Sequence, residues 1–311
     1  YYGYEETEQI CAYDNQSPDV TIRVNTLKAN TQALKKKLEQ AGVHVAEGRI
    51  CADALHLTKT ADLSRLDAFK EGLFHVQDES SQLAVRVLDP QRGEEILDLC
   101  AAPGGKSTQL AGKMQGRGLL VCNEINSKRA KILASNIERL GIANALVLNE
   151  HPQRLEARFE GFFDKILVDA PCSGEGMFRK EEAAVTDWSE ETVFMCARRQ
   201  AEILHSASVM LRPGGRLVYS TCTFSPEENE GSVSEFLHTH PDFSIEAVDA
   251  PWVSPGRPDW VQNPAPGLEQ TFRLWPHRLL GEGHYCAVLR KAGNGDGAEL
   301  PLEPAAKLPK E

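Results

Sequence analysis

The sequence lacks the long apolar run, about 18 residues or more, that a membrane-spanning helix requires. Its first six residues, YYGYEE, contain no basic segment followed by an apolar one, so no signal peptide is recognised. The eight cysteines include no CxxC pair, and they form no cluster with histidines at metal-ligand spacing. These absences argue against a membrane protein, a secreted protein and a metal site. We expect a cytoplasmic monomer whose thiols are mostly reduced.

Basic residues are also fewer than acidic ones. The chain has 34 Lys and Arg against 45 Asp and Glu, which gives a net charge of −11 at pH 7. An acidic chain is a poor general binder of nucleic acid. The distribution is uneven, however, because residues 21–49 hold six basic side chains against two acidic ones. This segment is therefore a candidate for contact with a polyanion, although a solvated helix face also accounts for the run Lys35–Lys37.

The hydrophobic pattern divides the chain into three parts. Residues 1–78 predict a small α+β module, with strands at 21–24, 54–57 and 73–76 and a helix at 31–40. Residues 79–291 alternate strands and helices, which predicts an α/β fold with a doubly wound, mostly parallel, Rossmann-like sheet. Its strands are expected at 96–99, 119–122, 145–148, 165–168 and 215–220, in the order 3-2-1-4-5, with a closing strand at 285–289. Residues 292–311 are rich in Gly, Pro and Glu and are expected to form a linker or tail.

A glycine-rich turn joins the first of these strands to the next helix, at the edge where such sheets bind ligands. Its residues are Cys100, Ala101, Ala102, Pro103, Gly104, Gly105 and Lys106. The two glycines let a ligand approach the backbone, and the helix start offers free N–H groups. A loop that binds the phosphates of a nucleotide is the alternative interpretation of this turn, but such a loop requires a glycine at the position of Cys100. Glu124 ends the second strand, where a carboxylate can accept both hydroxyls of a ribose.

Two thiols follow the fourth and fifth strands. Asp169 and Pro171 precede Cys172, and Cys222 lies in the turn Ser220–Thr223. A lone cysteine is more often a buried structural residue. Two cysteines at neighbouring strand ends beside a cofactor loop instead favour chemistry on a ring carbon. A thiolate that adds to C6 of a cytosine makes C5 nucleophilic, and Asp169 is placed to protonate or share a proton at N3. Lys106 is a nearby cation that can lower the pKa of the thiol.

Three segments carry a family resemblance: LDLCAAPGGKSTQLA (97–111), DAPCSGEGMFRK (169–180) and RPGGRLVYSTCTFSPEENE (212–230). The chain resembles the Sun (Fmu) family of RNA cytosine-5 methyltransferases, in its bacterial ribosomal-RNA branch, from about residue 4 to residue 291. The resemblance implies a class I methyltransferase sheet and S-adenosylmethionine held by residues 100–106, Glu124 and Asp169. It implies that Cys222 is the nucleophile and that Cys172 assists product release. It also implies an acid after the third strand, which we assign to Glu150, with His151 as the alternative register.

The resemblance implies RNA as the partner, most directly 16S ribosomal RNA, with transfer RNA as the alternative substrate. For contacts with its phosphates we predict Arg23, Lys28, Lys35, Lys36, Lys37, Arg179 and Lys180. Three rival classes remain. A nucleotide hydrolase would turn over ATP without methyl transfer, a DNA or small-molecule methyltransferase would ignore RNA, and a non-catalytic RNA-binding scaffold would not need Cys172, Cys222 and Asp169.

Overall fold

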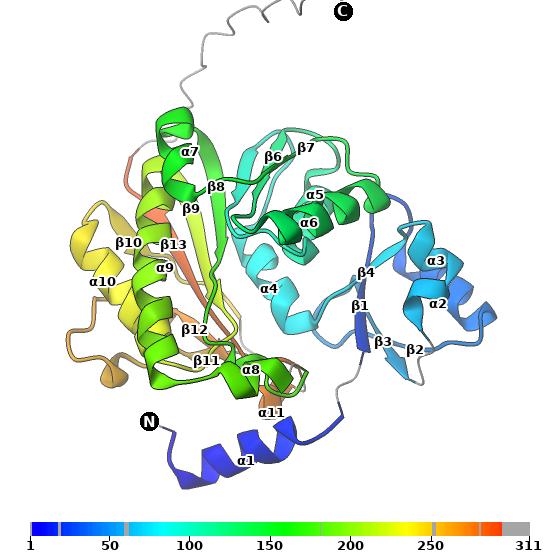
Figure 1. Ribbon diagram of the computed structural model, residues 1–311, viewed down its shortest axis with the longest axis horizontal. Coiled ribbons are helices and arrows are strands. Elements are labelled where there is room, and N and C mark those ends of the chain that lie inside the picture. The colour runs from blue at the N-terminus through cyan, green and yellow to red at the C-terminus, as the bar shows by residue number, and fades with distance from the viewer. Residues whose placement is uncertain are drawn as a thin grey trace, which may run out of the picture.

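The computed structural model of the protein describes residues 2–17, 20–58, 62–180, 182–250, 253–279 and 281–293. It contains a small antiparallel sheet and a large, mostly parallel sheet, which lie side by side (Figure 1). Most of the predicted tail, from residue 294 onward, lies outside the described residues. Within the described residues, no helix is both long and apolar enough to cross a membrane.

The small sheet contains four strands in the order β2-β3-β1-β4, all antiparallel to their neighbours. They are β1 (Val20–Val24), β2 (His44–Glu47), β3 (Ala54–Thr58) and β4 (Phe74–Val76). The helices α2 (Thr31–Gln40) and α3 (Asp67–Lys70) belong to the same module, and Leu34 and Leu38 of α2 share an apolar core with strand residues such as Ile22 and Phe74. The sequence predicted β1, β3, β4 and α2. It missed β2, because most of that strand is exposed and lacks an apolar alternation.

Helix α1 (Tyr4–Asp14) packs away from the small sheet. It contacts the short helix α11 (Pro276–Leu279), and its Ile10 shares an apolar cluster with Phe224 and Trp275 (Figure 1). The sequence did not predict α1, because the segment EETEQ has no apolar stripe. The first residues of the chain are therefore attached to the large sheet, although the small module follows them in sequence.

The large sheet has nine strands, eight of them in the order β11-β12-β13-β9-β8-β5-β6-β7, with β10 paired to β13. The path β7-β6-β5-β8-β9 is the predicted parallel order 3-2-1-4-5. The parallel strands are β5 (Glu95–Asp98), β6 (Leu119–Asn123), β7 (Ala145–Leu148), β8 (Phe163–Asp169) and β9 (Leu211–Thr221). The antiparallel strands are β10 (Phe243–Ile245), β11 (Ser254–Pro255), β12 (Phe272–Leu274) and β13 (His284–Lys291). The predicted α/β fold is confirmed.

Helices cover both faces of this sheet. The first layer contains α4 (Glu79–Leu88), α5 (Gly105–Met114) and α6 (Ser127–Leu140), which form one apolar core with alternate strand residues. The second contains α7 (Pro152–Phe159), α9 (Glu190–Met210) and α10 (Ser232–Thr239), which form the other core. The π-helical turn η3 (Glu227–Gly231) precedes α10, and α8 (Glu182–Asp187) precedes α9. Short 3-10 turns lie at η1 (Leu63–Arg65), η2 (Glu175–Met177), η4 (Pro258–Trp260) and η5 (Leu268–Gln270).

Arg23 joins the small sheet to the large one. Its guanidinium donates to Gln77 Oε1 at 2.7 Å, to Thr108 Oγ1 at 2.7 Å and to the carbonyl of Gly105 at 3.2 Å. The residue is only 2% exposed, and burial lowers its pKa to about 10. The prediction that Arg23 contacts RNA phosphates is therefore wrong. Its hydrogen bonds fix the start of α5 against β1. They therefore help to hold the glycine-rich turn in place.

Candidate active site

A cavity of about 1270 Å³ opens at the carboxyl ends of β5, β6, β8 and β9. This volume exceeds that of a typical drug-sized ligand site, so a cofactor and a second molecule can share it. Strand β4 and the segment before α4 form the wall on the side of the small sheet, and α9 forms another wall. Of the residues predicted for catalysis or cofactor binding, all except Gly104 and Glu150 line this cavity.

The glycine-rich turn shapes one end of the cavity. Gly104 has a φ of 108°, a backbone conformation that residues with side chains disfavour, and this conformation allows α5 to begin at the next residue. The carbonyls of Ala102 and Pro103 accept hydrogen bonds from Arg129 at 2.7 Å and from Asn136 at 2.9 Å. The turn is therefore held from outside, and its inner surface is left free for a ligand.

Asp98, at the end of β5, is a buried acid with spare hydrogen-bonding capacity. One carboxylate oxygen accepts from Ser107 Oγ at 2.6 Å, while Oδ1 has no hydrogen-bond partner among the described residues. Burial raises the pKa of Asp98 to about 7. A ligand that donates a hydrogen bond or carries a positive charge would satisfy this carboxylate.

Glu124 lies at the end of β6 and is 3% exposed. Its carboxylate accepts from the backbone N–H of Asn126 at 2.8 Å and lies 3.6 Å from Arg129. Glu150, by contrast, directs its carboxylate to Arg154 at 3.4 Å, and His151 lines the cavity at this point. Of the two registers considered, the geometry therefore favours His151 over Glu150.

Lys106 and Asp169 form an ion pair at the centre of the cavity. Lys106 Nζ lies 2.8 Å from Asp169 Oδ2 and donates to Ser81 Oγ at 2.9 Å. Ser220 Oγ donates to the other oxygen of Asp169 at 2.9 Å. Burial acts to lower the pKa of Lys106, but the adjacent carboxylate outweighs it and the net shift is upward. Lys106 therefore keeps its positive charge.

The two predicted thiols meet beside this pair. Cys172 Sγ lies 3.3 Å from Cys222 Sγ. The contact follows from the parallel pairing of β8 and β9, in which Asp169 is opposite Ser220, and from a hydrogen bond of 2.8 Å between Gly176 N–H and the Cys222 carbonyl. A side chain at position 176 would meet that carbonyl and the backbone of Gly283, so glycine is required for the close approach.

Two glutamates missed by the sequence analysis hold the cysteine turns. Glu228 accepts from Ser173 N–H at 3.1 Å and from Gln200 Nε2 at 2.8 Å. Glu175 accepts from Thr223 Oγ1 at 3.0 Å and from Phe224 N–H at 2.8 Å. Both residues stood within quoted motifs, but an acidic residue in a loop carries no sequence signal of its burial, and here Glu228 is buried and Glu175 is half-buried.

Burial raises the pKa of Glu228 to about 7, against hydrogen bonds from Ser173 and Gln200 that lower it. In the unfolded chain the carboxyl returns to an ordinary value of 4.5. Between these values the unfolded chain has lost the proton and the folded chain keeps it, so the free energy of unfolding falls as pH rises through this window.

We therefore expect the Glu228→Gln variant to gain stability relative to the wild type between about pH 5 and pH 8, by roughly 3 kcal/mol at most. Thermal unfolding of both proteins at several pH values measures the difference. The exposed Glu235→Gln variant is the control and should follow the wild type. A difference that is independent of pH would contradict the assignment of this proton to Glu228.

His284 is another cavity residue that sequence reasoning missed. It is 6% exposed, and its Nδ1 has no hydrogen-bond partner among the described residues. Burial, helped by the charge of Lys106, lowers the pKa of His284 to about 4. The ring is therefore neutral near pH 7, and it faces the cavity as a polar but uncharged group.

The predicted phosphate contacts are mostly engaged elsewhere. The side chain of Arg179 is 5% exposed and pairs with Glu282 at 3.0 Å, so its prediction as an RNA contact is wrong. Lys180 lines the cavity mouth and pairs with Glu282 at 2.8 Å. Lys28 donates to the carbonyls of Glu71 and Arg139, while Lys35 and Lys37 pair with Glu47 and Glu71. Of the seven, Lys36 alone is exposed with neither an ion pair nor a side-chain hydrogen bond to any described residue.

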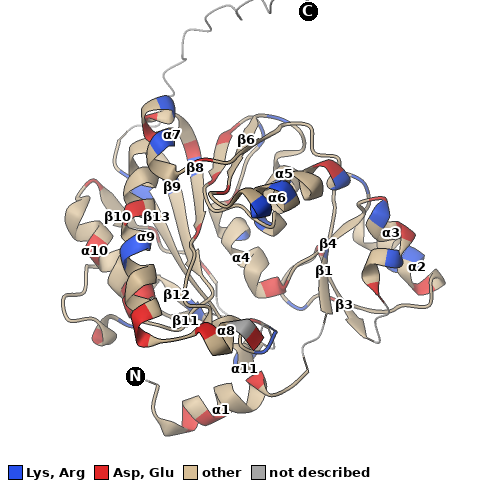
Figure 2. Cartoon of the chain, viewed as in Figure 1, with Lys and Arg blue, Asp and Glu red and all other residues tan. Residues whose placement is uncertain are grey.

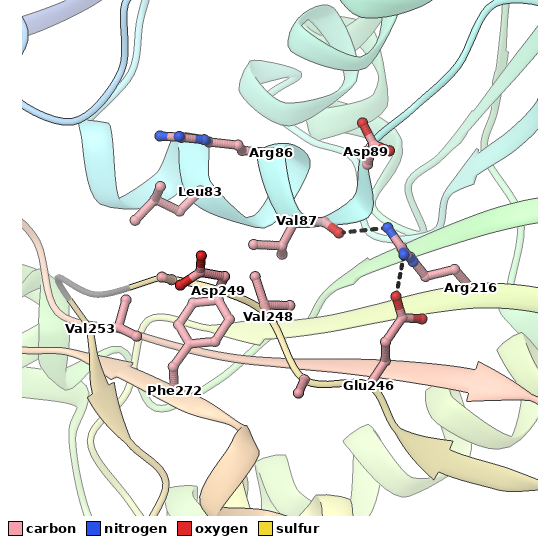
Figure 3. A pocket seen from close by; sticks show the side chains of 12 residues that line it. Leu83, Arg86, Val87, Asp89, Arg216, Glu246, Val248, Asp249, Val253 and Phe272 are labelled. Carbon is pink, nitrogen blue, oxygen red and sulfur yellow. Dashed lines mark hydrogen bonds and ion pairs between the residues drawn. The ribbon is translucent and has the colours of Figure 1, made fainter.

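A second, smaller cavity of about 320 Å³ lies between α4 and the β9 and β12 strands (Figure 3). Its walls combine apolar and charged side chains, and Leu83 and Val87 of α4 point toward Phe272. Arg216 donates to the carbonyl of Val87 at 3.3 Å and pairs with Glu246, so its charge is already satisfied. None of the predicted site residues lines this cavity, and we do not assign it to the chemistry.

Comparison with known proteins identifies the family of this chain. Residues 85–290 match the family described as 16S rRNA methyltransferase RsmB/F, and residues 1–64 match the ferredoxin-like domain of the same proteins. The probable ribosomal RNA small subunit methyltransferase B of Bacillus subtilis is 32% identical over 306 residues, which cover 94% of this chain and 64% of the relative. The ribosomal RNA small subunit methyltransferase F of Klebsiella pneumoniae is 35% identical over 295 residues, which cover 93% of this chain and 61% of the relative.

A solved structure of a methyltransferase homolog protein from Pyrococcus horikoshii superposes with a TM-score of 0.79 and is 29% identical. The alignment covers 92% of this chain and 91% of that one. The chain spans about three-fifths of the length of the curated relatives, from 61% to 64%. The chain belongs to the RsmB/F branch of the Sun family, whose members are S-adenosylmethionine-dependent methyltransferases.

Proposed function

We propose that this chain is the catalytic part of an RNA methyltransferase that places a methyl group on C5 of a cytosine in 16S ribosomal RNA. The observation that carries the proposal is the contact of two thiols at 3.3 Å beside the Lys106–Asp169 ion pair, in the cavity that the glycine-rich turn closes. We also propose that the small module ends at residue 78 and that the methyltransferase domain begins at residue 79.

The residues at one end of the cavity fit S-adenosylmethionine. The unpartnered oxygen of Asp98 suits a cationic or hydrogen-bond-donating group, and the buried carboxylate of Glu124 suits ribose hydroxyls. Ile125, which lines the cavity and is 59% exposed, offers an apolar surface to a purine. When bound, the cofactor supplies a methyl group on a positively charged sulfur.

The other end of the cavity fits a cytosine. A thiolate that bonds to C6 pushes the ring electrons toward C5 and N3, which makes C5 nucleophilic. The Asp169 carboxyl, within 2.8 Å of Lys106, can hold or share the proton at N3. After methylation the proton on C5 leaves, and the bond between sulfur and C6 breaks. The base must be unstacked to reach this depth, so we infer that a single-stranded or loop segment is the substrate.

Electrostatics supports Cys222 as the nucleophile. The hydrogen bond between Cys172 and Cys222, together with burial and nearby Glu228, raises the pKa of Cys172, so this group stays a thiol. Lys106 lines the same cavity as Cys222, and its ammonium is a cation that can attract negative charge on the nucleophile. We propose that Cys172 acts afterwards, in removal of the C5 proton or release of the product.

Tritium at C5 of cytosine tests the proposal. We expect the chain, given S-adenosylmethionine and 16S ribosomal RNA labelled at C5, to release one tritium into water for each methyl group transferred. Methylation of the exocyclic amine would transfer methyl groups and leave the tritium in place. No transfer to 16S ribosomal RNA, with transfer to transfer RNA, would support the alternative substrate instead.

A further inference from the structure

One cation in the cavity wall has no partner. The cavity is lined by four Lys or Arg side chains of the described chain: Lys106, Arg129, Lys180 and Arg199. Lys106 pairs with Asp169, Arg129 with Glu124 and Lys180 with Glu282. Arg199, which is exposed on α9, forms no ion pair or hydrogen bond with any described residue. Its guanidinium is therefore free to bind an anion that enters the cavity.

Arg199 precedes a residue that supports the Pro-Cys turn. The adjacent Gln200 donates to the carbonyl of Pro171 at 3.0 Å, directly before Cys172, and to Glu228, which holds the same turn. Arg199 is therefore on the helical turn that supports the Pro-Cys segment. Arg199 and both thiols line the same cavity, so an anion bound by Arg199 shares the cavity with the base that the thiols contact.

The net charges of the proposed ligands identify the anion. This inference rests on the proposed function, in which the cavity holds S-adenosylmethionine and a neutral cytosine. The cofactor carries a sulfonium and an ammonium against one carboxylate, so neither ligand brings a net negative charge. The remaining anion in such a complex is the phosphodiester next to the target nucleotide, and a guanidinium matches its geometry.

An apolar surface continues from this arginine along the outside of α9. Phe194 is 57% exposed and Met195 is 43% exposed, and they lie one helical turn before Arg198 and Arg199. Trp188, just before the helix, is 40% exposed. Single-stranded RNA binds to such combinations of cations and apolar side chains, because bases stack on aromatic rings. In Figure 2 the arginines form a blue band across the middle of α9, with acidic residues at its lower end.

We infer that Arg199 binds the phosphodiester flanking the target cytidine and that Phe194 stacks on a neighbouring unpaired base. The α9 face thus supplies an RNA contact that the basic segment 21–49 does not. Glu202, three residues further along α9, also lines the cavity and opposes phosphate at this place.

Binding of a short single-stranded RNA with one cytosine to the full chain, measured over a range of salt concentrations, tests the inference. We expect Arg199→Ala to weaken binding about tenfold at low salt. It should also reduce the slope of log affinity against log salt by about 0.7, the value for one phosphate contact on a single strand. Arg199→Lys should restore the slope. Phe194→Ala should weaken binding and leave the slope unchanged.

Two further variants make the test selective. Arg158, exposed on α7 and without an ion pair to a described residue, gives the control Arg158→Ala, which should bind like the wild type. Glu202→Gln should tighten binding, because it removes a negative charge near the phosphate. If Arg199 only balances Glu202, Glu202→Gln will not tighten binding and the slope will not change in Arg199→Ala, which would overturn the inference.

The cofactor must be measured in parallel. If Arg199 holds the carboxylate of S-adenosylmethionine instead, Arg199→Ala will lose affinity for the cofactor and keep the salt slope, which also overturns the inference. The proposed function is tested separately by tritium release in the wild type. A chain that releases no tritium but shows the slope change at Arg199 would contradict the function and leave the RNA contact standing.

Discussion

The Cys222→Ala variant is expected to lose methyl transfer to RNA by roughly a thousandfold or more, as enzymes do when their nucleophile is removed. In the proposed mechanism Cys222 supplies the sulfur that bonds to C6, and without that bond C5 is too weak a nucleophile to accept a methyl group. Transfer of a radiolabelled methyl group from S-adenosylmethionine to 16S ribosomal RNA measures the loss.

The matched control is cofactor affinity. Among the described residues, Cys222 forms no hydrogen bond with Asp98, Glu124 or the turn residues 100–105, so Cys222→Ala should bind S-adenosylmethionine as tightly as the wild type does. If the variant retains more than about a tenth of the activity, Cys222 is not the nucleophile. A variant that loses cofactor affinity as well would point to a misfolded turn, and thermal unfolding distinguishes that case.

The Cys172→Ala variant is expected to accumulate a covalent complex between protein and RNA. Cys172 Sγ lies 3.3 Å from Cys222 Sγ, and its raised pKa keeps it a thiol that can take part in proton transfer at the end of the reaction. Without it, the bond to C6 forms but breaks slowly. A band that survives denaturing electrophoresis and disappears on ribonuclease treatment measures the complex.

The double variant Cys172→Ala with Cys222→Ala controls this result, because it should form no covalent complex. A complex that appears with Cys222→Ala alone, and not with Cys172→Ala, would reverse the roles of the two thiols. Product formation at the wild-type rate in Cys172→Ala would show that Cys172 has no part in release.

Much of the fold could be predicted from the sequence, because strong periodicity and clear caps mark the elements. Helix α6 begins after Asn126, which caps its first turn, and is followed by Gly141 in the left-handed conformation, and both residue types are common at these helix boundaries. Helix α1 was missed for the opposite reason. Its stability comes from a distant contact with α11, which no local pattern encodes.

The cofactor end of the site was easier to predict than the substrate end. The turn 100–106 and Glu124 follow strand ends directly, so their positions follow from the parallel sheet. The prediction of RNA contacts failed because the presence of a basic residue in the sequence does not show whether its side chain pairs with RNA or with an acidic residue of the protein. Arg23 is a buried link between the two sheets, and Arg179 is paired with Glu282. Arg199, which forms no ion pair with a described residue, stands in a helix with three glutamates and belongs to no basic run.

The supporting shell around the thiols could not be predicted either. Glu175 and Glu228 bond to backbone and side chains of both cysteine turns, and these contacts join segments about 50 residues apart, such as the Ser173–Glu228 pair with a separation of 55. Only the packing of β8 against β9 brings them together. Their positions therefore depend on the tertiary structure rather than on local spacing.

Peptide mapping by mass spectrometry of the complex that Cys172→Ala forms with RNA tests the central claim most directly. The account predicts a single cysteine peptide, containing Cys222, that carries the mass of a methylated cytidine nucleotide. Attachment at any other residue, or a complex without the added methyl group, would contradict the claim that both sulfurs act on one pyrimidine.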